Sequence, residues 1–195
     1  MDNSTIVRAA TTVGIISTTT FWSMNFTINH LTFPSLLLGG VPKSSVKADQ
    51  LSPRFLTAST DETQVSNALL NRQWQEMYWR GHRWGPASAI LSGVAFLNAA
   101  YFSDAESISR YCYAAAAVAA VSVVPWTLAI MVPVNDELHR RGDAQRLAED
   151  KGESKEIKGD GRDFMTLIRT WLGYNNIRAS LALISTVTGV VGTFQ

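Results

Sequence analysis

Four long stretches of the chain contain no Asp, Glu, Lys or Arg, and the charged residues gather in the gaps between them. These stretches cover residues 9–42, 84–103, 111–135 and 179–195. A helix of a soluble domain keeps one polar face and therefore scatters charge along its length. A helix of about 20 apolar residues, in contrast, is what crosses the hydrocarbon core of a bilayer. The pattern predicts an all-α, integral membrane four-helix bundle.

We expect a single membrane domain over residues 1–195, because neither a repeat nor a linker divides the chain. The predicted membrane spans are about 9–33, 86–103, 111–134 and 170–194. Pro34 is expected to kink or end the first helix, since proline has no amide hydrogen. Residues 140–162 are rich in charge and glycine, which predicts a solvated loop before the last span.

Lys and Arg predict the orientation. The two long loops carry most of these residues, whereas the opposite side has little more than Arg8 and Arg110. Because Lys and Arg are enriched in cytoplasmic loops, we expect both long loops to be cytoplasmic and both termini to be lumenal or extracellular. Asn3 begins a glycosylation sequon on that far side. The alternative of a cleaved signal peptide is disfavoured, because the first window is too long and broken by threonines.

The first cytoplasmic loop contains a further helical signal. Residues 59–62 have the spacing of a capping box, which predicts a helix that ends near residue 80. Trp74, Tyr78 and His82 recur at four-residue intervals and would share one face of it. We therefore predict an additional amphipathic helix in this loop.

Composition excludes several classes of function. Charged residues make up 17% of the chain, below the roughly 25% of soluble domains, while mean hydropathy is only +0.03 because the loops are polar. The net charge of +1 argues against nucleic acid as a partner. Cys112 is the only cysteine, so the chain can form neither an internal disulfide nor a cysteine-cluster metal site. The predicted spans contain no Asp or Glu, which argues against a proton-coupled transporter.

Arg178 is the sharpest candidate for function, because an arginine inside a membrane span is costly. It lies roughly 10 Å along a helix that begins near Trp171, at about 1.5 Å per residue. Trp171, Asn175 and Arg178 are spaced so that they share one face. An amide and a guanidinium on an inward face could hold an anionic oxygen. The alternative is an arginine whose side chain extends to the headgroups.

Other polar and aromatic residues converge on the cytoplasmic ends of the spans under this topology. They are His30, Tyr78, His82, Asn135 and His139. Each histidine taken alone is also explained as an interfacial or loop residue, and Asn135 could simply cap the carbonyl that Pro133 frees. In the first span, Asn25 and Asn29 lie on one stripe, which we expect to face other helices because unsatisfied amides are costly in lipid.

Three sequence blocks resemble a known family in their order and spacing. They are Trp74-x-x-x-Tyr78-x-x-Gly81 followed by Pro86, then Pro125-Trp126-Thr127 with Pro133-x-Asn135-x-x-Leu138, and finally Trp171-x-x-x-Asn175-x-x-Arg178. In these blocks and in its four-span layout, the chain resembles the DUF1772 membrane proteins and, among them, the fungal anthrone oxygenases of aromatic polyketide pathways. The resemblance extends over nearly the whole chain.

The resemblance implies a reaction in secondary metabolism. Dioxygen would oxidise a polyketide anthrone at its central methylene carbon to an anthraquinone, with water as the by-product. This chemistry needs a base and hydrogen-bond donors to a developing oxyanion. We assign the base to His82 or His139, and the donors to Asn135, Asn175 and Arg178. The expected substrate-binding residues are His30, Trp74, Tyr78 and Trp171.

Two alternatives stay open at the level of the sequence. One is a non-catalytic four-span scaffold or lipid-binding protein, and the other is a haem- or metal-dependent oxidoreductase of a different substrate. The sequence requires no cofactor and indicates no metal site, although a histidine could ligate a haem or a metal ion. The expected partners are an aromatic polyketide, dioxygen and the lipid bilayer, and so small a bundle is also compatible with a homo-oligomer.

Overall fold

A computed structural model describes residues 2–38, 67–152 and 160–195, and in this part of the chain all regular secondary structure is helical. The elements are α1 (Asn3–Thr27), the π-helical turn η1 (Ile28–Thr32), α2 (Phe33–Leu38), α3 (Asn67–Gly81), α4 (Trp84–Phe102), α5 (Ile108–Trp126), the π-helical turn η5 (Thr127–Met131), α6 (Val132–Asp150) and α7 (Phe164–Gly192). The predicted all-α fold is therefore confirmed.

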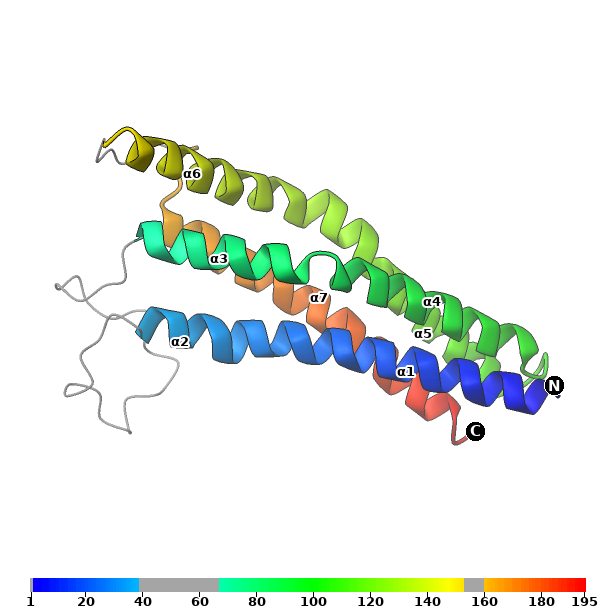
Figure 1. Ribbon diagram of the computed structural model, residues 1–195. Helices are drawn as coiled ribbons and strands as arrows, with labels where there is room; N and C mark the ends of the chain where they lie inside the picture. The colour runs from blue at the N-terminus through cyan, green and yellow to red at the C-terminus, as the bar shows by residue number, and fades with distance from the viewer. Residues whose placement is uncertain (1, 39–66, 153–159) are drawn as a thin grey trace.

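These elements form four long helical segments that lie side by side (Figure 1). Helices α1, α4, α5 and α7 pack in cyclic order, so that each contacts two neighbours. The two termini and the α4–α5 turn lie at one end of the molecule, and α2, α3 and α6 extend toward the other (Figure 1). The chain therefore runs up and down between the two ends.

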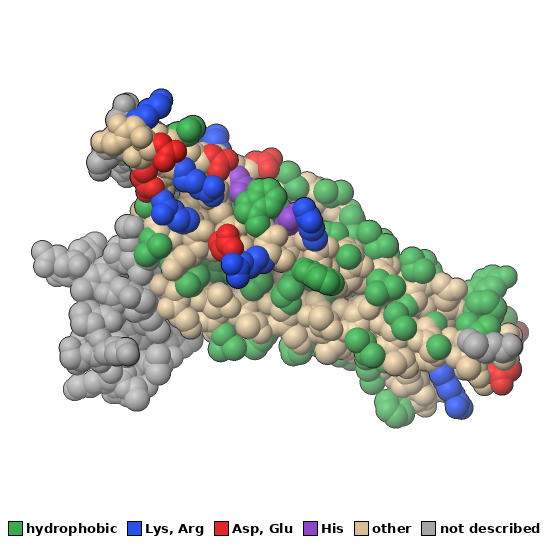
Figure 2. All heavy atoms as spheres, viewed as in Figure 1, with side chains coloured by type: hydrophobic (Ala, Val, Ile, Leu, Met, Phe, Trp, Pro, Cys, Tyr) green, Lys and Arg blue, Asp and Glu red, His purple; other side chains and the backbone are tan. Residues whose placement is uncertain are grey.

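In the bundle of α1, α4, α5 and α7, many buried side chains are small, although Phe21, Phe96 and Tyr113 are also buried, and many large apolar side chains point outward. On α4, Ser92 and Ala99 are completely buried, whereas Leu91 and Leu97 are each 53% exposed. The same arrangement recurs on α5 and α7, where the exposed residues include Val118, Val121, Ile184 and Val187. Small residues let membrane helices approach closely, while large apolar residues suit contact with lipid. On the visible face, the charged side chains gather on the half that contains α3 and α6 and at the opposite tip, with few between them (Figure 2).

Two of the helical segments are long and apolar enough to cross a membrane. They are Asn67–Phe102 and Ile108–Asp150, judged on the described residues alone. The segments that contain α1 and α7 carry more polar residues, among them Asn25, Asn29, Asn175 and Arg178. These same residues face the inside of the bundle, so their polarity does not mark a wet outer surface.

Each of the two π-helical turns precedes a proline. The amide of Phe33 donates to the carbonyl of Ile28 just before Pro34, and the amide of Val132 donates to that of Thr127 just before Pro133. A wider turn accommodates a proline that would clash with the helix behind it. We expected Pro34 to kink or end the first helix, but the chain continues in helical form to Leu38.

The predicted loop over residues 140–162 is wrong for residues 140–150, because α6 continues to Asp150, while residues 153–159 lie outside the described part of the chain. Its charged residues pair along the helix: Glu137 accepts hydrogen bonds from Arg140 at 2.8 Å and from Arg141 at 2.7 Å. Such i,i+3 and i,i+4 pairs stabilise an exposed helix. Gly142 also lets α6 approach α3, since a Cβ at this position would lie 2.4 Å from the Gln75 amide.

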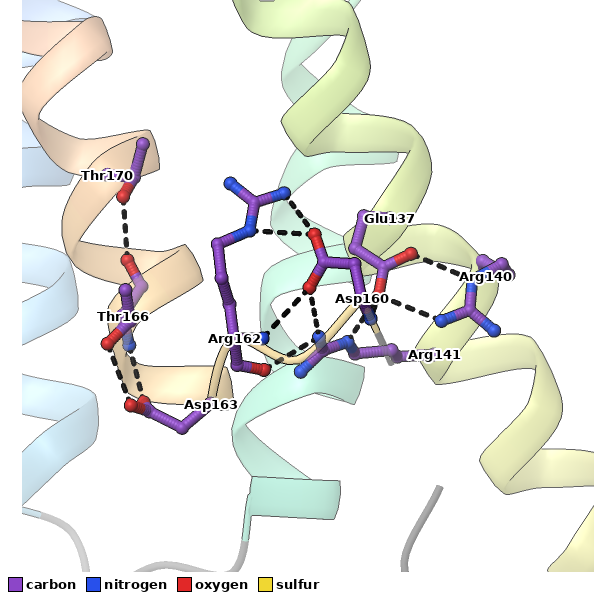
Figure 3. A network of polar contacts seen from close by, with 8 residues as sticks. All are labelled: Glu137, Arg140, Arg141, Asp160, Arg162, Asp163, Thr166 and Thr170. Atoms are coloured by element: carbon purple, nitrogen blue, oxygen red, sulfur yellow. Dashed lines mark hydrogen bonds and ion pairs between the residues drawn. The ribbon is translucent and has the colours of Figure 1, made fainter. Parts of the chain in front are cut away.

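An ion-pair network joins α6 to the start of α7 (Figure 3). Arg141, which is only 8% exposed, donates to Asp160 at 2.9 Å and to the carbonyl of Arg162 at 2.8 Å. Hydrogen bonds from Arg140 lower the pKa of Glu137 to about 2, and those from Arg162 lower the pKa of Asp160 to about 2. The network fixes the chain that leads into α7.

Helix α7 begins at Phe164, earlier than the expected start near residue 170. The Asp163 side chain caps it by accepting from the amide of Thr166 at 2.7 Å (Figure 3). A short-chain acidic residue at this position satisfies an amide that otherwise has no helical partner.

Helix α3 corresponds to the helix predicted in the first long loop. It ends at Gly81, close to the expected residue 80, whereas the capping box at 59–62 lies outside the described residues. It follows the line of α4 and buries Leu70, Trp74 and Gln75, and it packs against α6 (Figure 1). Residues 82 and 83 alone separate it from α4.

Candidate functional site

A cavity of about 240 Å³ lies where α3 meets α4, enclosed by η1, η5 and α7. One part of its lining is polar, formed by Tyr78, His82, Thr127, Asn135 and Arg178. The remainder is largely apolar, formed by Met24, Ile28, Met77, Gly81, Gly85, Pro86, Leu128, Met131, Val132 and Trp171. The volume is just below the range of about 300–1,000 Å³ of typical ligand sites. The cavity therefore suits one compact, largely apolar molecule that has a few polar atoms.

Arg178 is held in the polar wall by two asparagines. Its Nη2 donates to Oδ1 of Asn25 at 2.7 Å and to Oδ1 of Asn175 at 2.7 Å. The guanidinium also lies over the Phe21 ring, 5.4 Å from the centroid. Among the described residues, none of the carboxylates pairs with Arg178, and its buried Nε has no hydrogen-bond partner. Within the described residues, the positive charge is therefore positioned without a carboxylate counter-ion.

The asparagines that hold Arg178 form a ladder between α1, η1 and α7. Asn175 donates to Oδ1 of Asn29 at 2.8 Å, and Asn29 donates to the carbonyl of Leu172 at 3.2 Å and to Asn176. Asn25 and Asn175 are completely buried. The prediction that Asn25 and Asn29 face other helices is confirmed. Their role in holding Arg178 was not predicted, although the four-residue spacing of the two amides indicated an inward face.

Trp74 and Tyr78 of α3 form a continuous stack with His82, which directly follows the helix, as their four-residue spacing indicated. The ring centroids of Trp74 and Tyr78 are 5.2 Å apart, and those of Tyr78 and His82 are 5.6 Å apart at an interplanar angle of 7°. Across from this stack, Trp171 Nε1 donates to Oδ1 of Asn135 at 2.9 Å. This bond fixes the orientation of the Asn135 amide, whose nitrogen is left as a donor.

The two candidate bases differ in their hydrogen bonds. Nδ1 of His82 lies 2.9 Å from the carbonyl oxygen of Trp79. Because a carbonyl can only accept, Nδ1 carries the proton and Nε2 of the neutral ring has a free lone pair. His139 instead lies against Trp74 and Tyr78, with its Nε2 buried and unpartnered. His82 lines the cavity and His139 does not, so the geometry favours His82 as a base.

The structure divides the predicted site residues into three groups. Those that line the cavity are Tyr78, His82, Asn135, Trp171 and Arg178. Trp74, His139 and Asn175 contact this group from behind, through ring packing or a hydrogen bond. His30 is exposed and packs on Phe26, with ring centroids 4.4 Å apart, so it is not among the residues that line the cavity. Asn3 lies at the exposed start of α1, far along the chain from the site.

Residues that could hold a metal ion do not cluster at this site. Over residues 2–38, 67–152 and 160–195, no three His, Cys, Asp or Glu side chains come close enough to form a metal site. The cavity therefore presents the positive charge of Arg178, hydrogen-bond donors from Asn135 and Tyr78, and the free lone pair of His82.

Comparison with known proteins places these residues in a family. The sequence profile of the anthrone oxygenases matches residues 74–188, more than half of the chain. The chain is 32% identical over 133 residues to monooxygenase hypC of Dothistroma septosporum, which covers 68% of this chain and 67% of that protein. It is 29% identical over 131 residues to the noranthrone monooxygenase of Aspergillus flavus, which covers 67% of this chain and 59% of the relative.

A third relative is anthrone oxygenase AgnL2 of Paecilomyces divaricatus, which is 28% identical over 141 residues, 72% of this chain and 79% of that protein. No solved structure matches the chain. The profile match includes the polar residues that line the cavity, which are Tyr78, His82, Thr127, Asn135 and Arg178. The chain belongs to the anthrone oxygenase family.

Proposed function

We propose that the protein is a membrane-bound anthrone oxygenase that oxidises a polyketide anthrone to an anthraquinone with dioxygen. The observation that carries this proposal is the guanidinium of Arg178, which lies in the wall of a largely apolar cavity and has no carboxylate partner among residues 2–38, 67–152 and 160–195. An anthrone is flat and apolar, and it carries one carbonyl oxygen that becomes negatively charged when the central methylene loses a proton. The cavity offers an apolar surface for the rings and a positive charge for that oxygen.

The proposed setting is a bilayer crossed four times, by residues of about 9–33, 86–103, 111–134 and 170–194. The outward-facing apolar residues and the small buried residues support this arrangement. The excess of Lys and Arg in the long loops supports a cytoplasmic position for these loops and a lumenal or extracellular position for the termini. In that topology the cavity lies near the cytoplasmic face. Pairing of two copies is compatible with this arrangement but is not needed for the chemistry.

In the first step, Nε2 of His82 takes a proton from the methylene carbon. The electron pair of the broken C–H bond delocalises onto the carbonyl oxygen, where Arg178 and the Asn135 amide stabilise the negative charge. Donors placed where charge develops are the largest common contribution to such a step. Tyr78 and Trp171 hold the ring system against this wall.

In the second step, the anion gives one electron to dioxygen, and the resulting radical pair combines into a C–O bond. His82 returns its proton to the distal oxygen, which yields a hydroperoxide. Removal of the second methylene proton breaks the O–O bond, forms the new C=O bond and releases water. One oxygen atom of O₂ therefore ends in the quinone and the other in water.

Membranes that contain the protein test this proposal. With ¹⁸O₂ and an anthrone, they should form anthraquinone faster than air oxidation does in matched membranes that lack the protein. The quinone should contain one ¹⁸O atom. Formation at the rate of the control membranes would instead support a non-catalytic scaffold, and an unlabelled quinone would contradict the mechanism.

A further inference from the structure

We propose that the substrate reaches the cavity sideways, from the headgroup region of the bilayer, through an opening between α1–η1 and the end of α3. The proposal rests on the proposed function, since it takes the anthrone as the molecule that passes. It assigns Gly81 as the residue that keeps the opening wide.

A second hollow of about 440 Å³ adjoins the cavity on the outside of the molecule. It is lined by Met24, Ile28, Glu76, Met77, Arg80 and Gly81. Four of these residues, Met24, Ile28, Met77 and Gly81, also line the inner cavity. The two spaces therefore adjoin across a shared, mainly apolar boundary, and the proposed passage runs through this boundary.

The passage has the chemistry expected of a route for a flat aromatic molecule. Methionine side chains are unbranched and flexible, so Met24 and Met77 can rearrange around a guest at small cost. Glu76 and Arg80 form the polar outer edge, where they pair with each other as exposed side chains. A hydroxylated aromatic ring system can keep its hydroxyl groups near this edge while its rings enter between the methionines.

The position of the opening fits the headgroup region. Trp79 and Trp84, which flank the junction of α3 and α4, are 57% and 70% exposed. Tryptophan prefers the boundary between hydrocarbon and water, so these residues mark the depth of the opening. Apolar aromatics that carry hydroxyl groups concentrate at the same depth, which supplies the passage with substrate.

Gly81 provides a sharp test because it lines both spaces and has room for a side chain. A Cβ placed there meets no atom within 4 Å. Gly173 on α7 is equally open but lines neither space. The variants Gly81→Ala, Gly81→Leu and Gly81→Phe should therefore narrow the passage in steps, and Gly173→Leu is the matched control.

The measurement is stopped-flow binding of a dihydroxyanthraquinone, followed by quenching of tryptophan fluorescence in purified protein in lipid nanodiscs. A narrowed passage slows association and dissociation together, so both rates should fall about tenfold or more in Gly81→Phe. Gly173→Leu should leave both rates unchanged. Three results would overturn the proposal. They are rates that do not depend on the residue at 81, a raised Kd with faster dissociation, and a lack of binding to the unaltered protein.

Failure of the passage and failure of the proposed function are distinguishable in this design. If the protein does not oxidise an anthrone but quinone binding still slows with the size of residue 81, the proposed passage is supported and the proposed function is contradicted. If oxidation proceeds and the binding rates do not depend on residue 81, the proposed function is supported and the proposed passage is contradicted.

Discussion

At the scale of single residues, the polar part of the cavity was predictable and the apolar part was not. Arg178 and Asn175 stand out because polar groups are costly in a lipid environment and must face inward. Met24, Met77 and Met131 line the same cavity, but the sequence does not show whether a methionine faces lipid, the protein core or a ligand. His30 was predicted to bind substrate because it lies near the end of a span. Its ring packs on Phe26 instead, and it is not among the residues that line the cavity.

The hydrogen bond from His82 Nδ1 to the Trp79 carbonyl predicts which histidine is the base. His82→Ala should reduce kcat/KM for the anthrone by about 10²–10⁴, the usual contribution of a general base. His139→Ala is the matched control and should have a smaller effect, because His139 does not line the cavity. Anaerobic exchange of the methylene hydrogens in D₂O provides a second readout, which His82→Ala should lose. Equal losses in the two variants would contradict the assignment.

At the scale of elements, the prediction of helices succeeded where apolar residues set the pattern and failed where charge dominated. The charged residues after Leu138 looked like a loop, yet they pair along α6 and with Asp160. Two of these pairs join distant positions, Arg141 with Asp160 at a separation of 19 residues and Arg72 with Glu149 at a separation of 77, which local spacing does not reveal. The sequence pattern also did not predict the π-helical turns before Pro34 and Pro133. A proline predicts that one helical hydrogen bond is missing, but not how the helix adjusts its geometry around it.

Close packing between the bundle helices predicts opposite effects of two alanine substitutions. A Cβ at Gly189 would lie 2.5 Å from the buried ring of Phe96, whereas one at Gly173 meets nothing within 4 Å. Gly189→Ala should lower the free energy of unfolding by about 1–3 kcal/mol through overpacking. Gly173→Ala should leave it equal or raise it by up to about 1 kcal/mol, because alanine favours the helix. Thermal midpoints in detergent measure both, and a destabilised Gly173→Ala with an unaffected Gly189→Ala would contradict the packing.

The ion-pair network predicts a loss of stability in acid. The pKa values of Glu137 and Asp160 are about 2 in the folded protein, below their ordinary values of 4.5 and 3.8. Depressed carboxyl pKa values contribute stability above the unfolded pKa, and the contribution is lost as the pH falls from about 4.5 to 2. Thermal midpoints should fall over that range, and Arg162→Gln should reduce the fall. An equal acid dependence in the two proteins would argue against the network.

At the scale of the whole molecule, the outward-facing apolar side chains support the proposed membrane setting. Many large apolar residues of α1, α4, α5 and α7 are exposed, whereas small residues such as Ser92, Ala99 and Ala116 are buried between the helices. On the visible face, the charged side chains gather on the half that contains α3 and α6 and at the opposite tip (Figure 2). Exposed apolar side chains in such number suit contact with lipid. The windows without charge predicted this arrangement from the sequence, but the cavity itself arises from four segments that are far apart in the chain, and spacing within one helix does not predict it.

The proposed topology predicts on which side of the membrane two sites lie. In a Cys112→Ser background, Gln145→Cys lies in α6 and Asp104→Cys lies in the α4–α5 turn, at opposite ends of the molecule (Figure 1). In sealed vesicles, an impermeant maleimide should label only one of the two cysteines. The other cysteine should become labelled only after the membrane is opened. Labelling of both from the same side would contradict four crossings.

The most direct test of the central claim is dioxygen uptake by purified protein with an anthrone, compared between the unaltered chain, Arg178→Ala and Arg178→Lys. We expect one O₂ consumed per anthrone, a loss of about 10²–10³ in kcat/KM for Arg178→Ala, and partial recovery in Arg178→Lys, which keeps the charge. Uptake by Arg178→Ala at the rate of the unaltered protein, with both equally folded, would contradict the claim that the unpaired guanidinium in the cavity stabilises the substrate anion.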